Sequence, residues 1–143
     1  TISLNGALNG NNIFAFSATD FWLVDGIAWH STDDHHLDDM RPPGNLHTCW
    51  GLNSNDMFFV GDAGIIYHYD GTKFTQMTSN TTKDLRSVWG TSSSDVWACG
   101  YNTSTGGTVL LHYDGSSWKE DILSVSYLFI QFTVTSLKNS EIA

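Results

Sequence analysis

A repeat of about 40 residues, a length typical of β-propeller blades, constrains the fold of this chain more than any other feature of its sequence. Segment 85–118 reads LRSVWGTSSSDVWACGYNTSTGGTVLLHYDGSSW, and segment 46–74 reads LHTCWGLNSNDMFFVGDAGIIYHYDGTKF. Trp50 and Trp89 lie 39 residues apart, as do Asp56 and Asp95. A weaker third copy, IFAFSATDFWLVDGIAWH, begins at Ile13.

Each copy divides into four short strands separated by polar turns. In the clearest copy the strands cover 85–90, 96–100 and 108–113, and a fourth begins near Trp118. The second strand is apolar on both faces, which is typical of a strand packed between two neighbouring sheets. The sequence therefore predicts an all-β protein built from four-stranded antiparallel propeller blades.

The copies divide the chain into five segments. Residues 1–12 read as the leading strand of a preceding blade, 13–45 as a degenerate blade, 46–84 and 85–122 as two blades, and 123–143 as the start of a further blade. About three blades cannot close a ring, which needs ~4–8. Two explanations remain open: the chain is a piece of a longer propeller, or several chains complete one ring together. The apolar run SYLFIQFTV at 126–134 would aggregate if left unpaired, so we expect it to pair within the next blade or with another chain.

The acidic composition argues against two classes of partner. Six Lys and Arg residues face fifteen Asp and Glu residues, which gives a net charge of −9. Phosphate contacts with nucleic acid need clustered cations, and so does attraction to anionic membranes. No run reaches the ~18 apolar residues of a membrane-spanning helix. We therefore expect neither nucleic-acid binding nor membrane insertion.

Residues that recur in all three copies are expected to stabilise the blade itself rather than to bind a ligand. They are an aspartate that ends a polar turn and a histidine in the third strand: Asp20, Asp56 and Asp95, and His30, His68 and His112. The aspartate can accept hydrogen bonds from backbone N–H groups of its turn. Gly71 and Gly115 each follow an aspartate, a pairing that supplies a positive φ in hairpins.

Apolar positions of the repeat predict how the blades pack. Large aromatic side chains are expected to fill the wedge between blades, at Trp22, Phe58, Trp89, Trp97 and Trp118. Cys49 and Cys99 take positions that valine holds in other copies. Each is therefore expected to be a small buried hydrophobe rather than half of a disulfide.

The phrase WG-x-S-S-S-D-V-W-A-x-G, followed by HYDGSSW, resembles the tandem propeller repeats of secreted or surface bacterial proteins, most of them functionally uncharacterised. The motif DGSSW at Asp114–Trp118 also resembles the Asp-box turn of sialidase-type propellers, and DGTKF at Asp70–Phe74 is a looser match. The Asp-box is a structural turn, so the resemblance implies a fold and not glycosidase activity. The resemblance covers roughly residues 13–118 and implies an extracytoplasmic location, secreted or at the cell surface. The sequence departs from the family pattern at two places: in the first copy, STDDHH replaces YDG, and after Asp121 no clear VWG motif returns.

One stretch that breaks the repeat could bind a metal. The segment DDHHLDD places four carboxylates and two imidazoles within seven residues, at Asp33, Asp34, His35, His36, Asp38 and Asp39. Carboxylate and imidazole are ligands for divalent cations. The segment lacks zinc-style spacing, and adjacent histidines point to opposite faces of a strand. A divalent cation and a solvated acidic turn are the two interpretations.

Two further stretches break the repeat in loops. The insertion YNTSTG lengthens one loop with Tyr101, Asn102, Thr103 and Ser104, and the connector MTSNTTKD holds Asn80 and Thr81. In an up-and-down blade both loops emerge at the same end of the sheet. Loops carry binding residues more often than strands do, so these six residues are candidates for contact with a partner.

The sequence favours a binding function over catalysis. It has no nucleophile elbow, no phosphate-binding glycine loop and no paired-cysteine metal motif. We expect a non-catalytic propeller module that binds or scaffolds a protein or a glycan through its loop face. The alternative is a carbohydrate-binding lectin whose chains form a ring by oligomerisation. A more distant alternative is a fragment of a metal-dependent or glycosidase-type propeller enzyme. No cofactor is expected beyond the divalent cation considered above.

Overall fold

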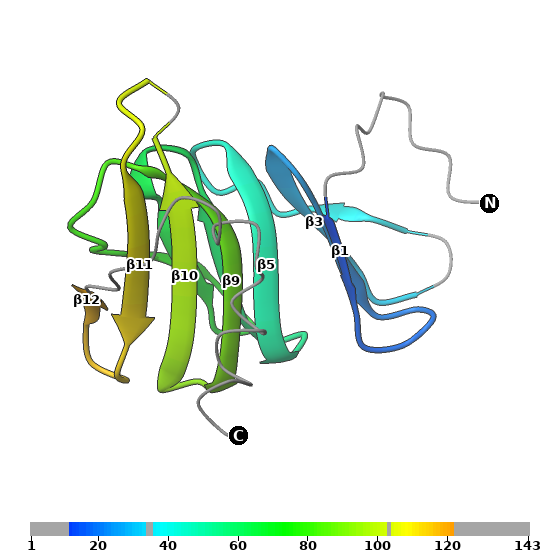
Figure 1. The fold of residues 1–143 in the computed structure, drawn as a ribbon. Helices are drawn as coiled ribbons and strands as arrows, with labels where there is room; N and C mark the ends of the chain where they lie inside the picture. Colours follow the sequence, from blue (N-terminus) through cyan, green and yellow to red (C-terminus); the bar gives the residue numbers. More distant parts are fainter. Residues whose placement is uncertain (1–11, 34–35, 103, 122–143) are drawn as a thin grey trace.

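The computed structural model describes residues 12–33, 36–102 and 104–121. These residues form three four-stranded antiparallel sheets in which strands adjacent in sequence are also adjacent in space (Figure 1). We call the sheets blade 1, blade 2 and blade 3. They confirm the all-β prediction of propeller-like blades, and within the described ranges they do not close a ring. The predicted segment 123–143 and most of segment 1–12 lie outside the described residues.

The strands follow the repeat closely. Blade 1 contains β1 (Asn12–Ala15), β2 (Phe21–Asp25), β3 (Ile27–Ser31) and β4 (Asp38–Asp39); blade 2 contains β5 (Leu46–Asn53), β6 (Asp56–Gly61), β7 (Ile66–Tyr69) and β8 (Phe74–Met77); blade 3 contains β9 (Asp84–Ser92), β10 (Asp95–Tyr101), β11 (Thr108–Tyr113) and β12 (Trp118–Glu120). A short 3-10 helix, η1 (Asp62–Gly64), joins β6 to β7. Within the described ranges no helix has the length and apolar character needed to cross a membrane.

Tight turns with an aspartate and a glycine close the last hairpin of blades 2 and 3. Gly71 and Gly115 adopt φ values of +91° and +93°, as predicted. Asp114 accepts hydrogen bonds from the backbone N–H groups of Ser116 at 2.9 Å and Ser117 at 3.0 Å. In blade 2 the carboxylate of Asp70 accepts the equivalent bonds from the two residues that follow Gly71, both at 2.9 Å. The hydrogen bonds and the adjacent lysine lower the pKa of both carboxyl groups, and that of Asp70 falls to about 2.

The core consists of two apolar layers between successive blades. We define the front face of a blade as the face turned toward the next blade, and the back face as the opposite one. Side chains alternate between the faces because successive strand residues point to opposite sides. The front of blade 1 packs on the back of blade 2 through Trp22, Val24 and Ala28 against Met57, Phe59 and Tyr67. The front of blade 2 packs on the back of blade 3 through Trp50, Phe58, Val60 and Ile66 against Val96, Ala98, Val109, Leu111 and Trp118.

The aromatic residues predicted to lie between blades divide into two groups. Trp22, Phe58 and Trp118 are at most 2% exposed and lie in the two layers. Trp89 and Trp97 are only half-buried on the front face of blade 3, which no following blade covers within the described residues. Trp89 nevertheless also packs against the layer between blades 2 and 3, with its ring centre 6.5 Å from that of Trp50. The wedge prediction is therefore confirmed for the first group and for Trp89, and not for Trp97.

Each blade contains a paired aspartate and histidine, as expected of structural residues. The histidine Nε2 lies 3.0, 2.7 and 2.8 Å from the aspartate Oδ1 in the three pairs His30–Asp20, His68–Asp56 and His112–Asp95. The imidazole also lies on the aromatic residue of the second strand; for example, the rings of Trp22 and His30 are stacked 4.2 Å apart. The predicted structural role of the histidines is confirmed. Their partnership with the aspartates was not predicted.

Both cysteines are free thiols. Cys49 is buried between blades 1 and 2, and Cys99 is half-buried on the front face of blade 3. Burial raises the pKa of the Cys49 thiol far above its usual value and that of Cys99 to about 11. The prediction of unpaired, apolar cysteines is confirmed, although Cys99 is less covered than Cys49.

Candidate binding surface at the loop end

The two off-pattern loops lie at the same end of the blades, as the strand order predicted. Tyr101, which ends β10, pairs with Asp84 at the start of β9, just after the connector 78–83. The Nζ of Lys83 in that connector donates a 2.7 Å hydrogen bond to the carbonyl of Thr108 after the insertion. We call this side, with η1 and the two loops, the loop end; in Figure 1 the loop between β10 and β11 lies at the top.

A polar network joins blades 2 and 3 at the loop end, and Asp62 lies at its centre. Asp62, in η1, accepts a 2.7 Å hydrogen bond from Asn45 Nδ2 and a short one from His47 Nε2. Arg86 on β9 reaches across, with its Nη2 3.9 Å from the Asp62 carboxylate and its Nη1 3.4 Å from His47 Nδ1. Arg86 also donates a 3.0 Å bond to Asp84, which in turn accepts the backbone N–H of Ala63 at 3.0 Å.

The network fixes the charges of its members. Burial raises the pKa of Asp62, but the hydrogen bonds from Asn45 and His47 and the charge of Arg86 outweigh that effect, so the net pKa lies below its usual value. An arginine can only donate hydrogen bonds, so the Nδ1 atom of His47 is the acceptor in their contact. The Nε2 atom of His47 then carries the proton that is donated to Asp62. Both nitrogens of this imidazole are thus engaged within the protein.

Arginine and tyrosine side chains make the outer part of this surface. The guanidinium carbon of Arg86 lies 5.9 Å from the centre of the Tyr101 ring, within the range of a cation–π contact. The Arg86 side chain is 39% exposed and Tyr101 is 37% exposed, so both present area to solvent while neighbours restrain them. The arrangement offers a planar cation and an aromatic ring to a ligand or partner.

The connector with Asn80 and Thr81 lines a shallow pocket beside η1. The pocket has a volume of about 440 Å³, and its walls include Ile65, Gln76, Met77, Ser79, Asn80 and Thr81. Asn80 adopts a left-handed φ of +59°, and the Ser79 hydroxyl donates to the Thr81 carbonyl at 3.3 Å. The walls therefore combine amide and hydroxyl groups with two apolar side chains. The connector singled out in the sequence contains Met77 and Ser79 as well as the candidates Asn80 and Thr81, whereas Ile65 and Gln76 were not indicated.

The insertion loop is shaped by its own asparagine. The side-chain Oδ1 of Asn102 accepts backbone N–H groups of Ser104 at 2.8 Å and Thr105 at 3.1 Å. Its main chain closes the loop through bonds with Gly106 and Gly107, both 2.8 Å long. Asn102 is therefore engaged in the loop itself, while Ser104 is exposed. Thr103, the remaining candidate of this loop, lies outside the described residues.

The acidic stretch of blade 1 does not gather its described side chains around one point. His36 Nε2 lies 3.0 Å from Asp38 Oδ1, and the His36 backbone N–H donates to Asp33. Asp39 instead accepts hydrogen bonds from the guanidinium and the backbone N–H of Arg41, which lower the pKa of its carboxyl group. Among the described residues no three His, Cys, Asp or Glu side chains form a group that could hold a metal ion. Two of the six candidate residues, 34 and 35, lie outside the described ranges, so the divalent-cation site stays a prediction.

The residues of the network were missed because each one looks ordinary within its own copy. A signal was nevertheless present in the aligned repeats, where His47 corresponds to Arg86 and Asp62 to Tyr101. Residues that differ so strongly in chemistry between copies are not required by the blade fold. The comparison of copies that singled out the two loops therefore singles out these strand ends as well.

Comparisons with family models, with curated proteins and with solved structures find no match to this chain. The resemblance to tandem propeller repeats and to Asp-box turns therefore stays a prediction. At one end of the blades the structure places together an anchored guanidinium, an aromatic ring, and a shallow pocket with amide and hydroxyl walls.

Proposed function

We propose that this chain is a non-catalytic binding or scaffold module of an extracytoplasmic protein, and that it contacts a partner protein through its loop end. The observation that carries the proposal is the Arg86–Tyr101 pair, held by the Asp62 network. Arginine and tyrosine are enriched among the residues that dominate protein–protein binding energies. Restraint of both side chains before binding reduces the entropy lost on association.

The proposal is tested with a displayed peptide library selected against the immobilised chain. The double variant Arg86→Gln, Tyr101→Ala removes the guanidinium and the ring. Loss of hot-spot contacts worth about 2 kcal/mol weakens binding about 30-fold. Lys119→Gln is the matched control, because it removes a 70% exposed cation beside the Asp114 turn, at the opposite end of blade 3. Selected peptides that bind the double variant as tightly as the unchanged chain would rule out this surface.

A second candidate function, glycan binding, is supported by the pocket beside η1. Its amide and hydroxyl walls can hydrogen-bond sugar hydroxyls, and Met77 and Ile65 offer apolar surface. A glycan array separates the two functions. Binding that Asn80→Ala abolishes, that free sugar competes, and that the Arg86–Tyr101 double variant leaves intact would favour the lectin. If no glycan on the array binds, and the selected peptides no longer bind the double variant, the results would favour the protein partner.

A further inference from the structure

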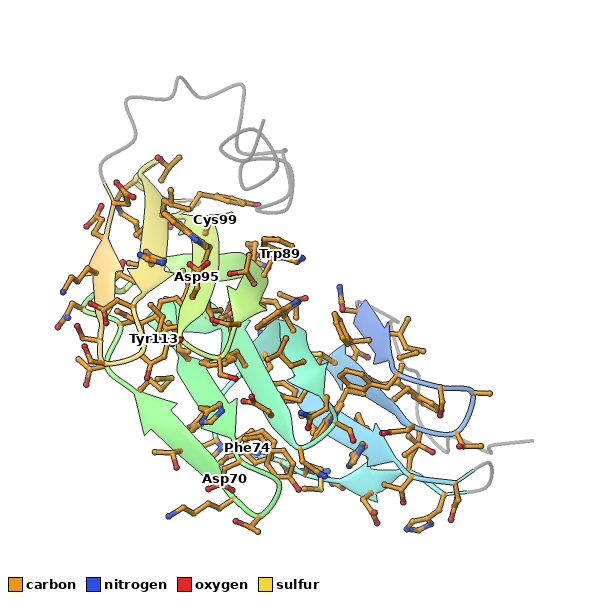
Figure 2. The ribbon with its side chains drawn as sticks, turned by 90° about the horizontal axis from the view of Figure 1, so that it is seen from below. Asp70, Phe74, Trp89, Asp95, Cys99 and Tyr113 are labelled. Atoms are coloured by element: carbon orange, nitrogen blue, oxygen red, sulfur yellow. The ribbon has the colours of Figure 1, made fainter. Side chains whose placement is uncertain are left out.

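The front face of blade 3 repeats the residue pattern that forms both interfaces between blades, yet it is incompletely covered. On the front of blade 2, Trp50, Val60 and Ile66 are buried, with exposed fractions of 6%, 0% and 0%. The corresponding residues on the front of blade 3 are Trp89, Cys99 and Leu110. These three are only half-buried, and Trp50 of blade 2 supplies part of the cover of Trp89, since the centres of the two rings lie 6.5 Å apart. Figure 2 shows Trp89 and Cys99 on the side of blade 3 turned away from blade 2. The paired aspartate and histidine are also formed there, with His112 Nε2 2.8 Å from Asp95 Oδ1.

The back face of blade 1 is the complementary surface at the other end of the stack. Cys49, Phe59 and Tyr67 on the back of blade 2 correspond by register to Ile13, Leu23 and Trp29 in blade 1. The blade 2 residues are at most 5% exposed. In blade 1, Ile13 is 60% exposed, and Leu23 and Trp29 are half-buried. Every one of these positions has kept an apolar side chain.

We propose that the front face of blade 3 docks onto the back face of blade 1 of a second copy of this chain. Both interfaces between the three described blades are made front to back, so the third front face continues an interface that these blades already form twice. The second copy supplies a back face like the one that blade 2 presents to blade 1. Its aliphatic and aromatic side chains would pack against the tryptophan and histidine side chains on the front of blade 3. Such an interface is head-to-tail, and it generates either a closed ring or an open chain of copies. The described residues of two copies hold six blades, a number within the ~4–8 at which propeller rings close.

The test uses two charged variants that damage opposite partners of the interface. Leu110→Asp places a carboxylate on the front face of blade 3, and Ile13→Asp places one on the back face of blade 1. Both positions are partly exposed, so the fold is expected to tolerate them; Leu110→Ser is the milder variant should Leu110→Asp not fold. Native mass is measured by light scattering on a sizing column across a range of protein concentrations, and circular dichroism checks the fold of each variant.

The expected results are specific to head-to-tail docking. The unchanged chain should show twice its mass of 15.8 kDa, or a ladder of multiples, and each variant alone should show the mass of a single copy. An equal mixture of the two variants should recover a complex of two copies. In that mixture the intact front face of the Ile13→Asp chain meets the intact back face of the Leu110→Asp chain.

Three results would overturn the proposal. The unchanged chain could show single copies at every concentration, which would mean that no second copy covers the face. The Ile13→Asp chain alone could associate like the unchanged chain, which would mean that two front faces meet. The mixture could remain as single copies, which would mean that the two faces are not partners.

Discussion

A matched pair of substitutions in β11 measures how much the layer between blades 2 and 3 contributes to stability. Leu111 is 1% exposed and packs among the apolar residues of that layer, whereas its neighbour Leu110 is half-buried on the opposite face. Leu111→Ala removes about three carbon groups worth ~0.8 kcal/mol each, or about 2.4 kcal/mol of transfer free energy. Adding the cavity that remains brings the expected loss in the free energy of unfolding to about 3 kcal/mol.

Leu110→Ala is the control, since it makes the same chemical change one residue away. Part of its side chain is already in water, so we expect a loss of about 1 kcal/mol. For a chain near 150 residues a change of 1 kcal/mol shifts Tm by about 2–4 °C, so Leu111→Ala should lower Tm by roughly 10 °C.

Urea unfolding followed by tryptophan fluorescence measures both variants, at protein concentrations where light scattering shows single copies. The slope of the free energy against urea concentration should stay unchanged, so that the midpoint reports stability directly. Equal losses for the two variants, or a larger loss for Leu110→Ala, would refute the assignment of the faces.

Three further predictions concern the loop end, the cysteines and the turns. Folding lowers the pKa of Asp62 below 3.8, so the ionised Asp62 carboxylate stabilises the fold above pH 3.8, and this stabilisation is lost as the pH falls through the pKa of the folded state. Asp62→Asn should therefore make the stability of the chain depend less steeply on pH in the acid range. An unchanged pH dependence would argue against the network. Cys99 should react with a thiol reagent faster as the pH rises toward about 11, while Cys49 should react only in denaturant. Mass spectrometry of labelled peptides measures both reactions, and labelling of Cys49 in the folded chain would contradict its burial. Gly115→Ala should cost about 1–2 kcal/mol in urea unfolding, because an alanine is strained at positive φ. The added Cβ would also lie 2.7 Å from a neighbouring side-chain carbon. Gly107→Ala is the control, since its new Cβ meets only the flexible end of a lysine, and equal costs would contradict the turn geometry.

The fold could be predicted because the repeat carries it locally. Each strand has an alternating or doubly apolar pattern, and each hairpin has its turn residues, so the bounds of β11 at 108–113 matched the prediction. Gly71 and Gly115 could be placed at positive φ from the aspartate before them. Strand and turn patterns of this kind depend only on residues that are close together in the sequence, so a single sequence is enough to identify them.

The candidate surface could be predicted only in part, because it depends on contacts between blades. His47 and Arg86 lie 39 residues apart and meet only when blade 3 packs on blade 2. No local pattern reports such a contact. The loops were found because an insertion is visible in the alignment of copies, whereas Asp62 was hidden in a short helix with no unusual composition.

The most direct test of the account is a nuclear Overhauser measurement between blades 2 and 3. In the structure the Trp118 indole Nε1 donates to the Met77 sulfur at 3.4 Å, across 41 residues of sequence. Front-to-back packing predicts a strong cross-peak between the Trp118 indole proton and the Met77 methyl group, and its loss in Met77→Ala would confirm the assignment. A spectrum without that cross-peak, in a chain whose strands are otherwise formed, would show that the blades do not stack in this way. It would also remove the basis for the network at the loop end.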